Sequence, residues 1–217
     1  MKYKYIFLDL DGTLTDSAEG ITNCARYALE KMGIEVSQND DLKRFIGPPL
    51  IVSFAEFYGL SEDDAKRAVE YYRERFSTIG IFENGVYDGV YEFLQKLLDN
   101  CRIPVLATSK PRIYAERIAV KYRLRPYLKM ISGAELNGVR NNKRDIIEYA
   151  INKLEINDRS RILMVGDRRH DIEGAAQCGV DSCGVTYGYA LPGELEKAGA
   201  KYIAHNFDEL YKIAIQA

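Results

Sequence analysis

The chain has 217 residues, of which 47% are hydrophobic and 29% charged, and its formal net charge is -2 at pH 7. This composition is ordinary for a globular protein, and it provides no broad basic surface for nucleic acid or an anionic membrane. No apolar run approaches the roughly 20 residues that a membrane-spanning helix needs, and Asp9 and Asp11 interrupt any signal-peptide core near the N-terminus. We therefore expect a cytoplasmic protein with no nucleic-acid or membrane partner.

The first predicted element is a strand over residues 4–8, which is short, apolar and rich in aromatic residues. The spacing of apolar residues then becomes helical and stays so up to about residue 80. We predict four helices in this block and no strand. The predicted helices cover residues 16–33, 39–46, 50–58 and 61–76.

Strands and helices alternate after residue 85. The predicted strands cover residues 103–107, 128–131, 161–165, 180–185 and 202–204. The predicted helices cover residues 90–98, 112–122, 143–154, 171–178 and 207–215. This alternation predicts an α/β fold, a Rossmann-like parallel sheet with helices on both faces. Residues 1–15 and 81–217 would form this core domain, and residues 16–80 an inserted all-helical domain.

Two acids, Asp9 and Asp11, stand directly after the first strand. Residues at i and i+2 point to the same side of an extended chain, so their carboxylates are expected to lie close together. Two such charges are unfavourable unless they share a cation or a proton. The pair therefore indicates a metal site, an acid/base role, or both. A calcium loop does not fit, because Thr13 and Leu14 stand where a third ligand and a glycine are needed.

Other polar residues follow later strands. Thr108, Ser109 and Lys110 end the second core strand, and Gly166-Asp167, with Asp171 four residues on, ends a later one. Lys143 opens the helix before that later strand. Ligands of open α/β sheets bind at the carboxyl ends of the strands, so these groups are expected to converge. Carboxylates suit a hard cation such as Mg²⁺, and hydroxyls with a lysine suit an anion, which together indicate phosphoryl transfer.

These residues resemble the four motifs of the haloacid dehalogenase superfamily of phosphohydrolases. The matching stretches are Asp9-Leu-Asp11-Gly12-Thr13, Thr108, Lys143 and Gly166-Asp167-x-x-x-Asp171, in that order. The helical block over residues 16–80 falls where that superfamily carries a cap domain. Residues 45–50, 108–111 and 184–189 further resemble its phosphoglycolate phosphatase and 5'-nucleotidase-like branch. Residues 168–170 fill the middle of the last motif, and whether they reach substrate or solvent stays open.

The resemblance implies a Mg²⁺-dependent phosphatase that acts on a small phosphorylated metabolite through an aspartyl-phosphate. It implies that Asp9 is the nucleophile and that Asp11 is the proton shuttle. Thr108 and Lys143 would stabilise the phosphoryl group. The implied metal ligands are Asp9, Asp167, Asp171 and, through its backbone carbonyl, Asp11.

The expected substrate-binding residues are Gly12, Thr13, Ser109 and Lys110, with Gly47 and Pro48 from a cap loop. Lys143 is preferred over Lys110 as the lysine that neutralises the phosphoryl group, because of its place relative to the last motif. Two other functions stay open at this point. A sugar phosphomutase would share the nucleophile and the metal, and a non-catalytic phospho-aspartate module would keep its acyl-phosphate.

Overall fold

The computed structural model describes residues 2–37, 40–137 and 139–216, and they group into two compact units. The first unit comprises Met1–Thr15 and Val86–Ala217, and the second comprises Asp16–Gly85. The chain passes between the units at β2 (Thr15–Asp16) and β3 (Gly85–Val86), which pair as a two-stranded ribbon. The second boundary thus lies five residues beyond the expected position after residue 80.

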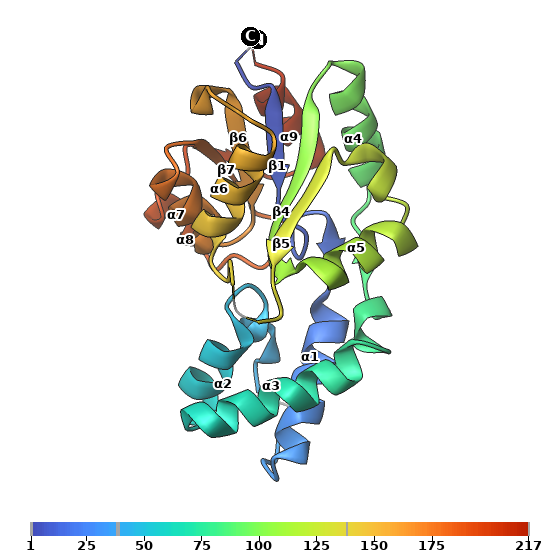
Figure 1. Ribbon diagram of the computed structural model, residues 1–217, viewed down its shortest axis with the longest axis vertical. Helices are drawn as coiled ribbons and strands as arrows, with labels where there is room; N and C mark the ends of the chain where they lie inside the picture. The colour runs from blue at the N-terminus through green and yellow to red at the C-terminus, as the bar shows by residue number, and fades with distance from the viewer. Residues whose placement is uncertain (1, 38–39, 138, 217) are drawn as a thin grey trace. The chain divides into compact units, whose positions relative to one another are not determined.

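The first unit is built on a six-stranded sheet with the order β5-β4-β1-β6-β7-β8, drawn at the centre of that unit in Figure 1. Each neighbouring pair is parallel. The strands are β1 (Tyr5–Leu8), β4 (Ile103–Pro111), β5 (Met130–Ala134), β6 (Ile162–Gly166), β7 (Asp181–Val185) and β8 (Tyr202–Ala204). The Rossmann-like α/β fold predicted from the alternating pattern is confirmed. β5 begins two residues later than predicted and runs three residues further.

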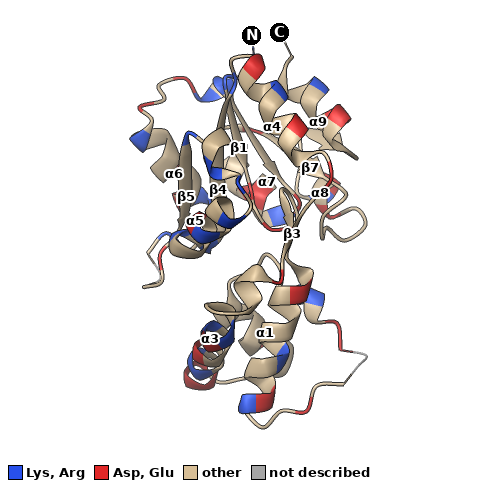
Figure 2. Ribbon diagram, turned by 90° about the vertical axis from the view of Figure 1, so that its right-hand side faces the viewer, with Lys and Arg blue, Asp and Glu red and all other residues tan. Residues whose placement is uncertain are grey.

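Helices cover both faces of this sheet, as Figure 1 and Figure 2 both show. α6 and α7 pack on one face, and α4 and α9 pack together on the other. The helices of this unit are α4 (Val90–Asp99), α5 (Arg112–Lys121), α6 (Lys143–Lys153), α7 (Arg169–Gln177), α8 (Glu194–Lys197) and α9 (Phe207–Ala214), with the 3₁₀ turns η3 (Arg125–Tyr127) and η4 (Arg159–Arg161). α6 follows β5 and α7 follows β6, so the first turns of both helices lie near the carboxyl ends of the strands.

The central strand β1 is held on all sides by pairing and packing. Ile6, Phe7 and Leu8 are fully buried, since the strand has a hydrogen-bonded neighbour on each side and helices on both faces. Phe7 belongs to a core cluster that also contains Val105 of β4 and Met164 of β6. The residues that follow β1 therefore start from a strand that packing holds in one position.

The second unit is helical among its described residues. Its elements are α1 (Ala18–Lys31), η1 (Leu42–Phe45), α2 (Leu50–Tyr58), α3 (Glu62–Phe76) and η2 (Gly80–Phe82). The helix predicted over residues 39–46 is wrong for the described part of that range, which contains only the short 3₁₀ turn η1. Residue 39 itself lies outside the described residues. Asp41 caps this turn by accepting a hydrogen bond from the Lys43 N–H, a local alternative to an α-helix.

The surface of α3 carries alternating charge, and Figure 2 shows residues of both signs along it. Lys66 pairs with Glu62, and Arg67 pairs with Asp64, in the first turns of the helix. Such exposed i,i+3 and i,i+4 pairs are screened by solvent and add little to the stability of the helix. Among the described helices, none combines the length and apolarity that crossing a bilayer requires.

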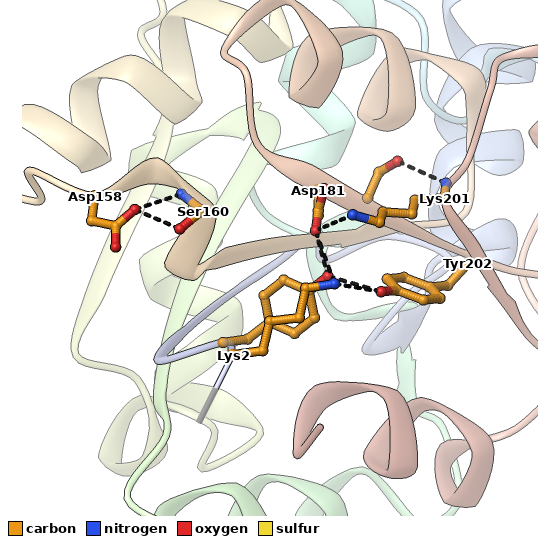
Figure 3. A network of polar contacts seen from close by, with 8 residues as sticks. Lys2, Asp158, Ser160, Asp181, Lys201 and Tyr202 are labelled. Carbon is orange, nitrogen blue, oxygen red and sulfur yellow. Dashed lines mark hydrogen bonds and ion pairs between the residues drawn. The ribbon is translucent and has the colours of Figure 1, made fainter. Parts of the chain in front are cut away.

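A second polar region lies at the amino ends of the strands, and Figure 3 shows it. Asp181, at the start of β7, accepts hydrogen bonds from Tyr3 Oη at 2.5 Å and from Lys201 Nζ at 2.7 Å. Lys2 donates to the Tyr202 hydroxyl at 2.7 Å. We call these five residues the amino-edge network. They tie the chain before β1 to β7 and to the edge strand β8.

Candidate active site

The turn after β1 presents two carboxylates. The Asp9 N–H donates to Val165 O at 2.9 Å and so continues the pairing of β1 with β6 by one residue. The chain then folds back, and the N–H groups of Leu14 and Thr15 both donate to Leu10 O at 2.9 Å. Asp9 is thereby fixed to the end of the sheet, whereas Asp11 lies within the turn.

Glycine is required at position 12. Gly12 has a φ of 80°, and a Cβ there would lie 2.1 Å from Asp167 Oδ2. The turn therefore closes directly against the carboxylate that follows β6.

Lys143, in the first turn of α6, is the centre of the charged cluster. Its Nζ lies 3.0 Å from Asp9 Oδ1 and 2.6 Å from Asp171 Oδ1, and it donates to Ala107 O at 3.0 Å. Burial by itself would lower the pKa of Lys143, but the charges of Asp171 and Asp9 outweigh this effect and raise it. Lys143 therefore stays a buried cation across the physiological range.

Asp171 lies at the third position of α7. Its Oδ2 accepts a hydrogen bond from the Arg168 N–H at 3.1 Å, so it belongs to a capping box and is not the N-cap residue. The N-cap position belongs to Arg168. Burial raises the pKa of Asp171, Lys143 opposes the shift and Asp9 adds to it, and the net result is a pKa of about 6.

Asp167 follows β6 and is fully buried. Its Oδ2 accepts a hydrogen bond from the Tyr189 N–H at 2.8 Å, and its Oδ1 accepts one from Thr13 Oγ1 at 3.3 Å. Burial raises the pKa of Asp167 well above the usual range, and the nearby charges of Asp171 and Asp9 add to the rise. Without a compensating cation, the ionised form of this group is unfavourable.

Asp9, Asp167 and Asp171 form a group that fits a metal ion. Each offers one carboxylate oxygen, and these oxygens all lie within 4.8 Å of one another. The buried ammonium group of Lys143 pairs with two of these three buried carboxylates, those of Asp9 and Asp171. Oxygen donors of this kind suit a hard divalent cation. The cluster can therefore bind such an ion, and an ion would relieve its charge imbalance.

Asp11 does not belong to that group through its side chain. Its carboxylate forms an ion pair with Lys110, near the end of β4, and both side chains are largely buried. The nearby Thr108 is almost fully buried, and its Oγ1 accepts a hydrogen bond from the Lys110 N–H at 3.2 Å. Ser109, between them, is half-buried. The structure thus brings Lys110 to the proton-shuttle candidate, a contact that sequence reasoning missed.

Gly12 and Thr13 serve the turn itself in this structure. The Gly12 N–H donates to Thr15 O at 2.8 Å, and the Thr13 N–H donates to Leu10 O at 3.2 Å. In this structure both N–H groups are bonded within the turn, and the expected role of Gly12 and Thr13 in substrate binding stays a prediction. Their contribution to the site is the shape of the turn and the Thr13 hydroxyl on Asp167.

Three further residues complete the set of candidates. Gly47 and Pro48 stand between η1 and α2 in the second unit, where Gly47 has a φ of 107°. Arg168, whose role the sequence left open, donates from Nε to Glu194 Oε1 at 2.9 Å. The sequence contains no spacing that would have paired α7 with Glu194, which opens α8.

A segment within the family-like stretch 184–189, to which the sequence assigned no residue of the site, also reaches the site. It comprises residues 186–189 after β7, and it contacts both the turn and Asp167. The signal available in the sequence was a glycine, Gly188, just beyond the carboxyl end of a parallel strand. Such a residue allows close approach of another chain segment.

Comparisons with known proteins agree with this geometry. Residues 5–185 match the family model described as haloacid dehalogenase-like hydrolase. A 5'-nucleotidase of Pseudomonas aeruginosa is 42% identical over 195 residues, which cover 90% of this chain and 88% of that protein. The tyrosine-protein kinase PtkA of Mycobacterium tuberculosis is 35% identical over 207 residues, which cover 94% of this chain and 70% of that protein.

The solved structures include a close match. The crystal structure of a predicted phosphatase from Clostridium acetobutylicum superposes with a TM-score of 0.94 at 43% identity, covering 100% of both chains. The family match spans the turn after β1, β4, α6 and the motif after β6, so it includes every residue of the charged cluster. The chain therefore belongs to the haloacid dehalogenase-like hydrolase family, and within it is a phosphatase.

Proposed function

We propose that this phosphatase hydrolyses a small phosphomonoester through an aspartyl-phosphate, with a 5'-nucleotide as the first candidate substrate and phosphoglycolate as the second. The similarity to a 5'-nucleotidase over most of both chains supports that order. The observation that carries the proposal is the buried group of Asp9, Asp167 and Asp171 around Lys143. An excess of buried negative charge is unfavourable unless a bound cation balances it, and such clusters are typical of active sites.

Asp9, Asp167 and Asp171 would hold Mg²⁺, with the backbone carbonyl of Asp11 as a further ligand. Their oxygens lie within 4.8 Å of one another, and carboxylate oxygens are the ligands that Mg²⁺ prefers. When bound, Mg²⁺ would withdraw charge from the phosphoryl oxygens. The raised pKa of Asp167, caused first by burial and then by Asp171 and Asp9, supports a site that binds a cation when ionised.

In the first step, a carboxylate oxygen of Asp9 attacks phosphorus while the bond to the leaving oxygen breaks. The leaving oxygen takes a proton from Asp11, and Asp9 carries the phosphoryl group. Water then attacks phosphorus and gives a proton to Asp11, which releases phosphate and restores Asp9. Lys143, held 3.0 Å from Asp9 Oδ1, orients this carboxylate and balances charge on the phosphoryl group.

Lys110 and Asp11 are expected to part when substrate binds. Their ion pair occupies the Asp11 carboxyl group, which must be able to reach the leaving oxygen in the first step. A phosphate dianion offers Lys110 more negative charge than one carboxylate does, so Lys110 moves to the substrate. Thr108 donates its hydroxyl to the same phosphoryl group, since its Oγ1 already accepts from the Lys110 N–H. Ser109, between Thr108 and Lys110 in the sequence, is proposed to bind the substrate as well.

The second unit, Asp16–Gly85, is proposed as the cap that reads the leaving group, through the loop that contains Gly47 and Pro48. Pro48→Ala is then expected to raise KM for the physiological substrate several-fold. The KM for p-nitrophenyl phosphate, whose leaving group is unrelated, should change less. Equal changes for the two substrates would contradict a role in leaving-group recognition.

A phosphate-release screen tests the function. We expect the wild-type protein to release phosphate from one class of small phosphomonoester in the presence of Mg²⁺ and not with excess chelator. Asp9→Asn should lower kcat by at least about 10³-fold, because the nucleophile is lost. The matched control is Asp63→Asn, an exposed acid of α3 whose side chain is 95% accessible, which should leave kcat unchanged.

The same assay separates the rival functions. A sugar phosphomutase would isomerise a sugar phosphate without releasing phosphate. A phospho-aspartate module would accept one phosphoryl group and keep it, so it would release no phosphate. A kinase that transfers the phosphoryl group to a protein hydroxyl would leave it bound to protein and would not release it as phosphate. Near-full activity of Asp9→Asn would contradict the proposed mechanism.

A further inference from the structure

The segment that follows β7, residues 186–189, lies against the catalytic turn and has no role in the chemistry described so far. We infer that Tyr187 is a positioning residue, which fixes the turn and through it the carboxylate of Asp167. The inference rests on the proposed function, because it concerns the affinity of the same site for Mg²⁺.

Tyr187 contacts the turn directly. Its hydroxyl donates to Thr13 O at 3.2 Å. Its ring packs against Tyr87 and Phe207, with centroid distances of 5.5 Å and 4.9 Å. Tyr87 contacts the same turn, since its N–H donates to Leu14 O at 3.2 Å. The two tyrosines therefore connect the catalytic turn to the start of α9, an element far from the site in sequence.

The next two residues contact Asp167. A Cβ on Gly188 would lie 2.3 Å from Gly12 O and 2.4 Å from the Asp167 Cβ, so only glycine allows the segment to approach this closely. The Tyr189 N–H then donates to Asp167 Oδ2 at 2.8 Å. One backbone segment thus supports the turn through Tyr187 and the carboxylate through Tyr189.

Thr13 completes the connection. Its carbonyl accepts from Tyr187, and its hydroxyl donates to Asp167 Oδ1 at 3.3 Å. Each oxygen of Asp167 therefore receives one hydrogen bond, one from the turn and one from residues 186–189. Loss of the Tyr187 hydroxyl would free the turn to shift, and with it the donor to Oδ1. Hydrogen-bond partners of metal ligands typically change metal affinity by about 10- to 100-fold when removed.

Tyr187→Phe removes the hydroxyl and keeps the ring packing. Tyr187 acts one contact away from Asp167, so we expect Mg²⁺ binding, measured by calorimetry without substrate, to weaken by about 3- to 10-fold. In kinetics, the Mg²⁺ concentration for half-maximal activity should rise by the same factor. The KM for substrate at saturating Mg²⁺ should stay near the wild-type value, because weaker metal affinity no longer matters once the metal site is filled. A purely structural role would lower the melting temperature in chelator without this selective change.

Tyr211→Phe is the matched control. Tyr211 lines the same cavity of about 450 Å³ as Tyr187, and its hydroxyl accepts a hydrogen bond from Asn100 Nδ2 at 2.9 Å, a residue outside the catalytic turn. We expect unchanged Mg²⁺ affinity in this variant. Thr13→Val should weaken Mg²⁺ more than Tyr187→Phe does, and Thr13→Ser should restore binding. In the Thr13→Val background, Tyr187→Phe should add little, because the donor that it positions is gone.

The outcomes are distinguishable. If the wild-type protein binds Mg²⁺ and Tyr187→Phe binds it equally well, the inference is wrong and the proposed function stands. Additive effects of Tyr187→Phe and Thr13→Val would also overturn it. If the wild-type protein neither binds Mg²⁺ nor needs it for phosphate release, the proposed function fails as well.

Discussion

The two ends of one sheet carry two groups of charged residues that differ in balance and burial. The amino-edge network places Lys2 and Lys201 around Asp181, and the three side chains are 33%, 45% and 25% exposed. At the carboxyl edge, Asp9, Lys143, Asp167 and Asp171 form the charged cluster, which we call the carboxyl-edge cluster. The side chains of Lys143 and Asp171 are only 3% and 1% exposed. The first group has more cations than carboxylates, whereas the second has an excess of carboxylates.

The pKa shifts follow this difference. Burial alone would raise the pKa of Asp181, but the hydrogen bonds from Lys201 and Tyr3 outweigh it and lower the pKa. Burial also dominates at Asp167, where the neighbouring carboxylates Asp171 and Asp9 reinforce it, and the pKa rises. A network whose carboxylate prefers to be ionised stabilises the fold by itself. A cluster whose carboxylates resist ionisation is an electrostatic cost that a bound cation would remove.

Lys143→Met should have the largest effect on stability. The variant leaves Asp9, Asp167 and Asp171 buried without their ammonium partner, and removing one partner of a buried pair costs about 3–5 kcal/mol. Chemical denaturation in chelator near neutral pH measures this change. Adding Asp171→Asn to the variant should recover part of the loss. A variant as stable as the wild-type protein would mean that the cluster is not the electrostatic centre of the site.

The pH dependence of the metal-free protein should be intermediate in size. The pKa of Asp171 is about 6 in the folded protein against 3.8 in an unperturbed chain, so between these values the folded state holds a proton that the unfolded chain has released. The free energy of unfolding should therefore fall as pH rises from about 4 to 6. Asp181 has the opposite sign, because its lowered pKa adds stability that is lost in acid below its unfolded value.

Denaturation curves at several pH values, with and without Mg²⁺, separate these contributions. With Mg²⁺, the fall between about pH 4 and 6 should shrink or reverse, since the ion competes with the proton for the same carboxylates. Asp181→Asn should remove the acid-side contribution and leave the Mg²⁺ effect unchanged. A Mg²⁺ effect that is independent of pH over this range would argue against binding at the carboxyl-edge cluster.

Lys201→Met should have the smallest effect. It makes the same substitution as Lys143→Met, at the amino edge, where the side chain is 45% exposed. Exposed ion pairs contribute about 0–1 kcal/mol, so the free energy of unfolding should fall by less than about 1 kcal/mol. Phosphate release should not change. A loss comparable to that of Lys143→Met would remove the distinction between the two ends of the sheet.

Much of this arrangement could be predicted because parallel strands leave a strong signal. Buried strands such as β1 and β6 appear as short apolar runs, and the residues after them must meet at one edge of the sheet. The convergence of Asp9, Lys143 and Asp167 follows from that topology alone. The sequence patterns also predicted the positions of most helices.

The rest depends on contacts that no local pattern contains. The sequence offers two lysines for the site, Lys110 and Lys143. That Lys110 pairs with Asp11 and Lys143 with Asp9 depends on the length and direction of their side chains. Arg168, at the start of α7, pairs with Glu194 of α8, and β7 and a loop separate these two helices in the sequence. Residues 40–46 have helical spacing, but the Asp41 side chain accepts a hydrogen bond from the Lys43 N–H and caps a 3₁₀ turn in place of an α-helix.

The central claim is that the carboxyl-edge cluster is a cation site and the amino-edge network is not. The most direct test compares the free energy of unfolding with and without Mg²⁺ near neutral pH in the wild-type protein, Asp167→Asn and Lys201→Met. Mg²⁺ at about 100 times its Kd should stabilise the wild-type protein and Lys201→Met by about 2.7 kcal/mol, and Asp167→Asn far less. Equal stabilisation of Asp167→Asn, or none in the wild-type protein, would contradict the claim.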